Sequence, residues 1–195
     1  MAMTRFEKLF VNRQKKGDRN IETVRNRLIG LNIHNIHDVL EVGCGVGALS
    51  AFLSSEYGMN VNGTDFDAKQ IQMARELCDE SDQLHFRVED ATKLTFEDAS
   101  FDLAISQDVF HHIAAWPRAV SEIARVLRLG GHFIWIDMVF PSVITKLLRP
   151  LIKSYGLYTF AELRLEFREN GFEERFHKHL FHGPFAYHHF VLKKA

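Results

Sequence analysis

From residue 38 to residue 140, short apolar runs alternate with stretches of helical periodicity, and this alternation constrains the fold more than any other feature. The expected strands are 38–42, 60–64, 84–88, 101–106 and 132–140. The expected helices between them are 47–57, 68–79 and 117–128. Such alternation is typical of parallel strands joined by crossover helices. We therefore predict an α/β fold: a Rossmann-like, doubly wound sheet with helices on both faces.

The flanking segments extend this prediction. A helical pattern over 21–31 precedes the first strand, and Thr159 and Glu162 have the spacing of a capping box that begins a late helix. An antiparallel hairpin is expected at the end, from 172–181 and 187–193. The sheet would then have seven strands, mostly parallel. Because composition does not shift along the 195 residues, we expect one domain, residues 1–195.

Composition excludes several classes of protein. The chain is 46% apolar and 25% charged, as in globular domains, and its net charge of −1 offers no general attraction for nucleic acid. The first residues lack the apolar core of a signal peptide, and no apolar run approaches the roughly 20 residues of a transmembrane helix. The two cysteines form neither a disulfide framework nor a metal-binding spacing. We expect a cytoplasmic protein without a metal and without a nucleic-acid partner.

A glycine-rich loop follows the first expected strand. The sequence G-C-G-V-G-A places Gly43, Gly45 and Gly47 two residues apart and matches the dinucleotide fingerprint. Glycines allow a tight turn and a close approach of the backbone to a ligand. The same loop suits a nicotinamide dinucleotide, a nucleoside sulfonium, or a turn that binds nothing.

Carboxylates follow the next two strands. Asp65 and then Phe66 follow the second strand, and Asp90 follows the third. Ligands of open α/β sheets bind at the carboxyl ends of the strands, so these residues should lie near the glycine loop. One carboxylate suits a ribose diol and the other an exocyclic amino group. Together they predict an adenosine-type ligand.

Glu41 lies within the apolar run of the first strand. A buried carboxylate is costly unless it is paired. A ligand with an ammonium and a sulfonium would supply a partner, whereas a nicotinamide dinucleotide would not. The alternative, that Glu41 accepts backbone N–H bonds from its own loop, stays open.

Four motifs in order resemble those of class I S-adenosylmethionine-dependent methyltransferases. They are DVLEVGCGVGALS, NVNGTDFD, VEDATKLTFEDASFDLAISQDVFHHI and ARVLRLGGHFIWIDMV, which together span residues 38–140. The chain is similar in particular to the small-molecule branch that includes the quinone-biosynthesis methyltransferases. The resemblance implies S-adenosylmethionine as cofactor, S-adenosylhomocysteine as product and a small-molecule methyl acceptor.

The resemblance also implies roles around the methionine and ribose. Glu41 matches the acidic residue that serves the methionine ammonium, and Gln107 lies where the family lines the methyl end. Asp65 matches the acid that binds the ribose. The loop that skirts the methionine and ribose corresponds to Gly43, Gly45 and Gly47.

Around the adenine, Phe66 matches a residue that often lies against the ring. Asp90 and Ala91 match the pair that binds adenine, the first through its side chain and the second through its backbone N–H. A lid is implied within residues 1–37, and an acceptor-binding segment within 141–158.

His111 is the preferred candidate for a general base, ahead of its neighbour His112, because histidine titrates near neutrality and both follow the fourth strand. Similar turns occur in the family without a catalytic role. Two alternatives to the enzyme therefore stay open: a cofactor-binding regulatory domain without catalysis, and an NAD-dependent oxidoreductase. A nucleic-acid amino-methyltransferase would carry a proline-rich motif where this chain has SQDVF.

Two further features bear on partners. Five late histidines are expected on a solvated, half-polar hairpin, with zinc binding as the second interpretation: His177, His179, His182, His188 and His189. Two segments, FEKLFVNRQKKGDRN near the N-terminus and 141–156, mix apolar side chains with Lys and Arg. This composition suits an amphipathic or anionic acceptor or a loose contact with a membrane, unless these are solvated helix faces. The oligomeric state is left open, with a homodimer as one possibility.

Overall fold

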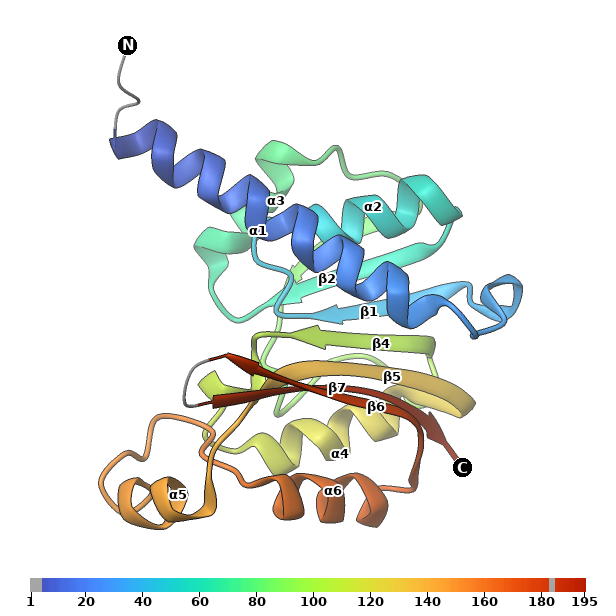
Figure 1. Ribbon diagram of the computed structural model, residues 1–195. Coiled ribbons are helices and arrows are strands. Elements are labelled where there is room, and N and C mark those ends of the chain that lie inside the picture. Colours follow the sequence, from blue (N-terminus) through green and yellow to red (C-terminus); the bar gives the residue numbers. More distant parts are fainter. Residues whose placement is uncertain (1–4, 183–184) are drawn as a thin grey trace.

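The computed structural model describes residues 5–182 and 185–195, and its centre is a seven-stranded sheet (Figure 1). The strands lie in the order β3-β2-β1-β4-β5-β7-β6. Their bounds are β1 Asp38–Val42, β2 Asn60–Asp65, β3 Leu84–Val88, β4 Phe101–Gln107, β5 Leu127–Val139, β6 Phe172–His182 and β7 Phe185–Lys194. β1 to β5 pair in parallel, and β7 pairs antiparallel with both β5 and β6. The predicted fold class, with its antiparallel hairpin, is confirmed.

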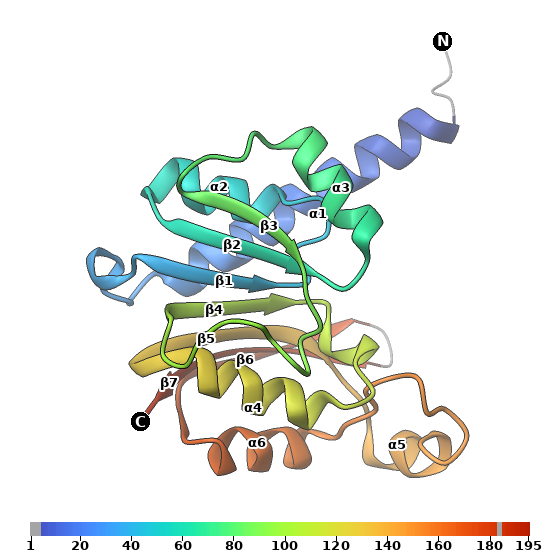
Figure 2. The same cartoon turned by 180° about the vertical axis from the view of Figure 1, so that it is seen from behind.

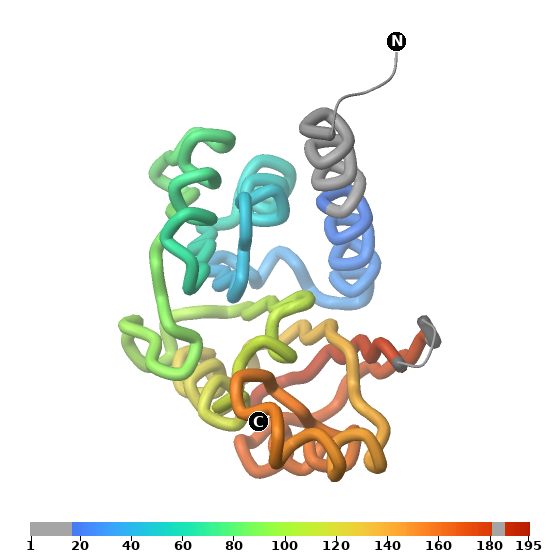
Figure 3. Tube along the Cα trace, turned by 90° about the vertical axis from the view of Figure 1, so that its left-hand side faces the viewer, coloured from blue at the N-terminus to red at the C-terminus, as the bar shows by residue number. Residues whose placement is uncertain are grey.

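Helices cover both faces of the sheet. Their bounds are α1 Arg5–Leu28, α2 Ala48–Tyr57, α3 Ala68–Leu77, α4 Trp116–Val126, α5 Ser142–Leu148 and α6 Phe160–Glu169, with short 3-10 turns η1 Ile33–Asn35 and η2 Phe110–His112. α1, α2 and α3 lie on one face, and α4 and α6 on the other (Figures 2 and 3). Within residues 5–182 and 185–195, no helix is both long and apolar enough to cross a membrane.

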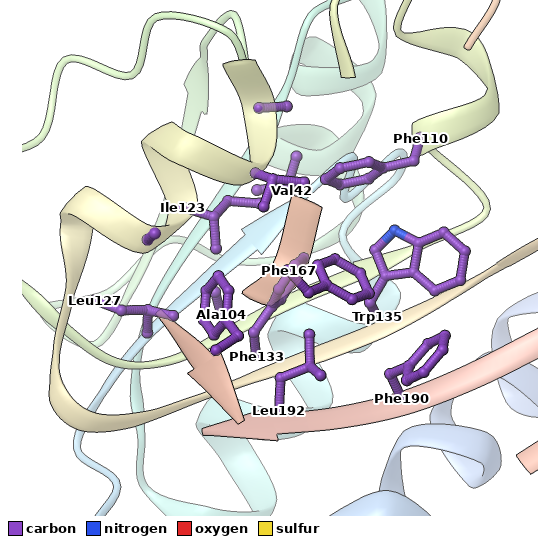
Figure 4. Close-up of a cluster of buried hydrophobic side chains, with 14 of the residues drawn as sticks. Val42, Ala104, Phe110, Ile123, Leu127, Phe133, Trp135, Phe167, Phe190 and Leu192 are labelled. Atoms are coloured by element: carbon purple, nitrogen blue, oxygen red, sulfur yellow. The ribbon is translucent and has the colours of Figure 1, made fainter. Parts of the chain in front are cut away.

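The sheet separates two hydrophobic cores. The core beneath α4 and α6 is rich in aromatic rings (Figure 4), with Trp135 and Phe190 centred 5.8 Å apart and Phe133 and Phe167 6.1 Å apart. The core beneath α1, α2 and α3 is mainly aliphatic. Strands buried on both faces need apolar residues at consecutive positions, which explains the continuous apolar runs of the sequence.

The first helix differs from its prediction. It extends from Arg5 to Leu28, whereas the sequence pattern predicted 21–31. Val24 and Leu28, which lie within the predicted pattern, are buried in the aliphatic core. The helix stops earlier because Gly30, with φ of +95°, turns the chain in the left-handed region.

The start of β5 also differs. We predicted that α4 runs to residue 128 and that Gly130 and Gly131 form the turn into a strand at 132. Instead, α4 ends at Val126 and β5 begins at Leu127. Gly130, with φ of +81°, lies inside β5, where the pairing with β4 shifts register. β5 therefore contains an irregular insertion between the residues that pair with Phe101 and Leu103, and Gly130 adopts the positive φ of this insertion without steric cost.

The capping box is confirmed at the beginning of α6. The Thr159 hydroxyl accepts a hydrogen bond from the Glu162 N–H at 3.3 Å, and the Glu162 carboxylate accepts one from the Thr159 N–H at 2.9 Å. Arg149 bonds the same carboxylate, which holds the pKa of Glu162 down at about 2. The chain between β5 and α6 is thus fixed at its far end.

Candidate functional site

A cavity of about 550 Å³ lies at the carboxyl ends of the parallel strands. It is formed by the segments that follow β1, β2, β3 and β4, together with part of the chain beyond α5. Its lining includes five of the residues that the sequence assigned to a cofactor: Gly43, Asp65, Phe66, Asp90 and Ala91. Residues separated by almost 50 positions therefore meet at one edge of the sheet, as parallel topology requires.

The glycine loop is shaped by close contacts. Gly43 has φ of +76°, and a Cβ placed there would lie 2.1 Å from a methyl carbon of Val109. Gly47 has φ of +80°, and a Cβ there would lie 2.6 Å from the ring of Phe86. Gly45 also has a positive φ, of +54°, but a Cβ there would meet only Gln70 Oε1, at an ordinary contact distance of 3.9 Å. A side chain at the first position would therefore displace Val109, which lines the cavity, and one at the third position would displace Phe86 in the core.

Asp65, the last residue of β2, is held by two backbone amides. One oxygen accepts from Gly45 N–H at 3.0 Å, and the other accepts from Asp67 N–H at 2.9 Å. A carboxylate offers about four acceptor positions, so capacity remains for a ligand diol. The next side chain, Phe66, is 78% exposed at the cavity, which is an unusual position for a large aromatic ring.

Asp90 lies just after β3 and is bonded through one oxygen. Its Oδ1 accepts from both the N–H and the hydroxyl of Thr92, each at 2.8 Å. Among the described residues no donor reaches Oδ2. That oxygen has lone pairs suited to an exocyclic amino group. Thr92, which the sequence analysis did not identify, fixes the orientation of this carboxylate.

Glu41 is buried in the centre of β1, with 7% of its surface exposed. Ser50 of α2 donates its hydroxyl hydrogen bond to Glu41 Oε2. Burial nevertheless raises the pKa of Glu41 to about 7. Both the hydroxyl and the backbone N–H of Ser50 bond this carboxylate, so a structural role for Glu41 within the protein stays open beside the cofactor role. Glu41 does not line the cavity in this structure.

Gly63 explains how Ser50 reaches that carboxylate. It is paired with Glu41 in the sheet, and a Cβ at Gly63 would lie 2.6 Å from Ser50 Oγ. Glycine is therefore required on β2 for the hydroxyl to approach.

Gln107 ends β4 and carries a buried side-chain oxygen, Oε1, that has no hydrogen-bond partner among the described residues. It does not line the cavity. A buried amide oxygen without a partner is costly. Among the residues that the structure describes, Gln107 thus lacks a hydrogen-bond partner for its buried oxygen, and Glu41 lacks a buried cation to pair with its carboxylate.

His111 is paired with a buried carboxylate that the sequence analysis missed. Its Nδ1 lies 2.6 Å from Oδ1 of Asp137 on β5, which is 1% exposed. Asp137 is also held by the N–H of Met138 at 2.7 Å and of His111 at 3.3 Å. The carboxylate thus fixes the hydrogen of the imidazole on Nδ1 and leaves Nε2 as the basic nitrogen. The signal was present: Asp137, like Glu41, interrupts an apolar strand.

His112 connects this pair with the cavity. It lines the cavity, and its ring centroid lies 4.0 Å from that of His111. His111 itself does not line the cavity. The ring of Tyr155, from the chain beyond α5, lies 5.8 Å from His112.

Asp108 is a second missed residue. It lines the cavity and has φ of +58°, which is strained for a residue with a side chain. Burial and the hydrogen bond to Asp108 raise the pKa of Tyr187, on β7, to about 12. The C-terminal hairpin therefore reaches the lining of the cavity.

The expectation of a solvated hairpin is wrong for two histidines. His188 and His189 are each 7% exposed and lie on opposite faces of β7. His177 Nε2 lies 2.9 Å from His188 Nδ1, with the rings nearly parallel, and burial lowers the pKa of His188 to about 4. The side chain of His182 lies outside the described residues. The described residues contain no cluster of three or more metal-ligating groups.

The donor set fits S-adenosylmethionine. The carboxylates of Asp65 and Asp90 stand at adjacent strand ends where a ribose and an adenine amino group would need acceptors. A cationic methionine end would pair with the buried Glu41, whose pKa is about 7, and with the unpartnered oxygen of Gln107. Gly43 lines the same cavity, and its lack of a side chain lets the loop pack against Val109.

Comparisons with known proteins agree. Residues 40–135 match the family model described as "Methyltransferase domain". The chain is 36% identical over 99 residues to 2-methyl-6-phytyl-1,4-hydroquinone methyltransferase of Synechocystis sp., covering 51% of this chain and 31% of that protein. It is 32% identical over 143 residues to sarcosine/dimethylglycine N-methyltransferase of Halorhodospira halochloris, covering 70% of this chain and 51% of that protein.

A solved structure shares the fold. A putative sarcosine dimethylglycine methyltransferase from Galdieria sulphuraria superposes with a TM-score of 0.79 at 16% identity, covering 91% of this chain and 86% of that chain. The chain spans between 31% and 51% of the length of the two curated relatives above.

Proposed function

Residues 40–135 form a methyltransferase domain, and from this premise we propose that the chain transfers a methyl group from S-adenosylmethionine to a small organic acceptor. The observation that carries the proposal is the cavity in which Gly43, Asp65 and Asp90 converge beside the buried Glu41. S-adenosylmethionine, when bound, supplies a methyl group already activated by the sulfonium. The protein then needs mainly to align the acceptor atom behind that methyl group, and positioning of this kind contributes roughly 7–11 kcal/mol.

We assign the nucleoside to the lining residues. Asp65 accepts hydrogen bonds from the ribose hydroxyls, while Gly45 N–H keeps its carboxylate in place. Asp90 accepts from the adenine amino group, Ala91 donates its N–H to a ring nitrogen, and Phe66 covers the base. The support is that the four residues assigned to the nucleoside, Asp65, Asp90, Ala91 and Phe66, all line the cavity.

We assign the methionine end to Glu41 and Gln107. The ionised Glu41 pairs with the ammonium, directly or through water, and Ser50 orients the carboxylate. Gln107 contributes its amide near the methyl end. Gly43 and Gly47 keep the loop free of side chains that would obstruct this region.

We assign the general base to His111, for an acceptor that loses a proton on methylation. Asp137 orients its imidazole and stabilises the imidazolium that forms. A base in such a position contributes roughly 10²- to 10⁴-fold. The ring of His112 lies between His111 and the cavity. The assignment therefore requires that His112 moves aside when the acceptor binds.

We propose that residues 1–195 act as one S-adenosylmethionine-binding domain in the cytoplasm, with 1–37 contributing a lid and 141–158 the acceptor side. Both cysteines are free thiols, which suits a reducing compartment. The named relatives methylate a prenylated hydroquinone and small amines, so the acceptor class is a small organic molecule and its nucleophilic atom is left to experiment.

Calorimetric titration tests the cofactor. We expect S-adenosylhomocysteine to bind and NAD to give no heat. Binding of NAD without binding of S-adenosylhomocysteine would overturn the proposal in favour of an oxidoreductase.

A panel of small organic acceptors with a labelled methyl donor tests catalysis. We expect label in at least one acceptor, and its loss in the Asp65→Ala variant. Cofactor binding with no labelled product across quinols, phenols and amines would instead indicate a regulatory domain.

A further inference from the structure

Four large apolar side chains are exposed on the segment that joins β5 to α6. Val143, Leu147 and Leu151 are spaced four residues apart and are 76%, 68% and 78% exposed, and Tyr155 is 50% exposed. We call these four residues the apolar strip. Protein surfaces carry scattered apolar side chains, but several large, strongly exposed ones gathered on one short segment are typical of an interaction surface.

The segment is firmly anchored. At its start, Phe140 N–H donates to the Tyr158 carbonyl at 3.1 Å, and at its end Gly156 N–H donates to the His111 carbonyl at 3.0 Å. Thr145, on the inner side of α5, is buried. The apolar strip is therefore presented outward by fixed structure, and α5 stands at a corner of the molecule beyond the carboxyl end of β4 (Figures 1 and 2).

The charge of the segment has a single sign. Between Asp137 and Glu162 the chain contains no acidic residue, and its cations are Lys146, Arg149 and Lys153. Arg149 is held by Glu162 at 2.7 Å. The two lysines are exposed and form no ion pair with any residue that the structure describes. Exposed aliphatic side chains beside unpaired lysines are complementary to an anionic lipid surface.

The apolar strip leads to the site. Ser154 lines the cavity, and Tyr155 contacts His112, which lies next to the proposed base. An acceptor dissolved in lipid could thus pass from the surface to the cavity without crossing bulk water. Self-association through the same strip is disfavoured, because a symmetric contact would bring the lysines of two copies together.

We propose that the apolar strip, with Lys146 and Lys153, docks the protein on an anionic lipid surface and opens the cavity toward lipid-dissolved acceptors. The docking is inferred from the exposed apolar side chains and lysines and does not depend on the proposed function. Only the entry of acceptors rests on that function. The protein attaches reversibly, because four side chains of one short segment provide a small buried area.

Flotation with lipid vesicles tests this. We expect the full chain to float with vesicles of phosphatidylcholine and phosphatidylglycerol, more weakly with phosphatidylcholine alone, and less at high salt. The Leu147→Ser/Leu151→Ser variant should lower the partition coefficient at least about tenfold. Lys146→Ser/Lys153→Ser should remove the preference for the anionic vesicles.

Leu129→Ser is the matched control, because Leu129 is 77% exposed at the opposite end of the sheet. It should float like the unaltered protein. Urea unfolding of every variant checks the fold, and titration with S-adenosylhomocysteine keeps failure of docking distinct from failure of the proposed function.

Three results would overturn the docking surface. They are no flotation of the unaltered protein with anionic vesicles, an equal loss in Leu129→Ser, and self-association that disappears in Leu147→Ser/Leu151→Ser. The last result would assign the apolar strip to a contact between copies.

Discussion

At the scale of a single residue, the buried carboxylate of Glu41 destabilises the fold but favours the binding of a cationic ligand. Its pKa of about 7 lies above its ordinary value near 4.5, so the folded state holds the proton more tightly than the unfolded state does. Stability is therefore lost as pH rises from about 4.5 to 7, and the cost is fully present above that range. A cationic ligand would offset this cost.

The Glu41→Gln variant should separate the two effects. At pH 8 we expect its free energy of unfolding to exceed that of the unaltered protein by about 1–3 kcal/mol, because a neutral amide replaces a buried charge. Its affinity for S-adenosylmethionine should fall at least about tenfold. Urea unfolding at pH 5 and pH 8 and calorimetry measure both. Glu56→Gln, on the exposed side of α2, is the control, and unchanged affinity in Glu41→Gln would remove Glu41 from the cofactor site.

The His111–Asp137 pair gives a second prediction at this scale. For an acceptor that loses a proton, His111→Ala should lower kcat by about 10²- to 10⁴-fold with little change in KM for S-adenosylmethionine. Asp137→Asn should lower kcat less and alter the pH profile, because the imidazole loses its orienting charge. Steady-state kinetics across pH distinguish this from a structural role. An unchanged kcat and pH profile in Asp137→Asn would show that the carboxylate only holds the turn.

At the scale of elements, the turn between β1 and α2 requires a glycine at position 43. Gly43→Ala should be destabilising both through its positive φ and through collision with Val109. Gly30→Ala, where φ is also positive but no atom lies within 4 Å, should cost only the backbone strain, roughly 1–2 kcal/mol. We expect Gly43→Ala to cost about 2 kcal/mol more in urea unfolding, and Val109→Ala in the same chain to restore part of it. Equal costs at the two glycines would contradict the contact.

The C-terminal hairpin contains a pH-sensitive pair. Burial lowers the pKa of His188 to about 4 and also lowers that of His177. Between about pH 6.5 and 4 the unfolded state binds more protons, so stability is present above that window and is lost as pH falls through it. Because His177 is partly exposed and the two rings titrate as a coupled pair, we expect a total loss of about 1–2 kcal/mol.

The His188→Phe variant should flatten this dependence, because a neutral ring keeps the packing against the neighbouring aromatic side chains. Chemical unfolding at several pH values between 4 and 7 measures it. His34→Gln, at an exposed position, should leave the dependence as it is. A slope that persists in His188→Phe would place the sensitivity elsewhere.

At the scale of the whole molecule, one sheet joins two cores and carries the cofactor site at its edge. Both cores rest on β1, β4 and β5, so neither can unfold without exposing the other. A ligand bound at the site should therefore raise the free energy of unfolding of the entire domain. S-adenosylhomocysteine at about 100 times its Kd should add about 2.7 kcal/mol. For a chain of this size that corresponds to a rise in Tm of roughly 5–10 °C.

Differential scanning calorimetry checks this prediction. We expect a single transition that moves as a whole, and no shift with NAD. Two transitions, of which only one responds to S-adenosylhomocysteine, would show that the halves of the sheet unfold separately.

Much of the fold and part of the site could be predicted from local sequence. The alternation of strands and helices predicts a parallel sheet, because a helix between two strands returns the chain to the end of the sheet at which the first strand began. The glycine loop and the carboxylates of Asp65 and Asp90 then fall at one edge, since parallel strands share their carboxyl ends. Misplaced boundaries occurred at Leu28 and Leu127, where a single glycine conformation rather than periodicity decides the course of the chain.

Tertiary structure alone decided the pairings between distant residues. Asp137 meets His111 across 26 positions, and Ser50 meets Glu41 from a neighbouring helix. The burial of His188 depends on how α6 packs on the hairpin. Periodicity reports which face of an element is apolar, but it does not report which polar groups on two elements come within hydrogen-bond distance. The sequence by itself therefore determined the sheet and its binding edge, whereas packing determined the protonation and orientation of the groups that would act there.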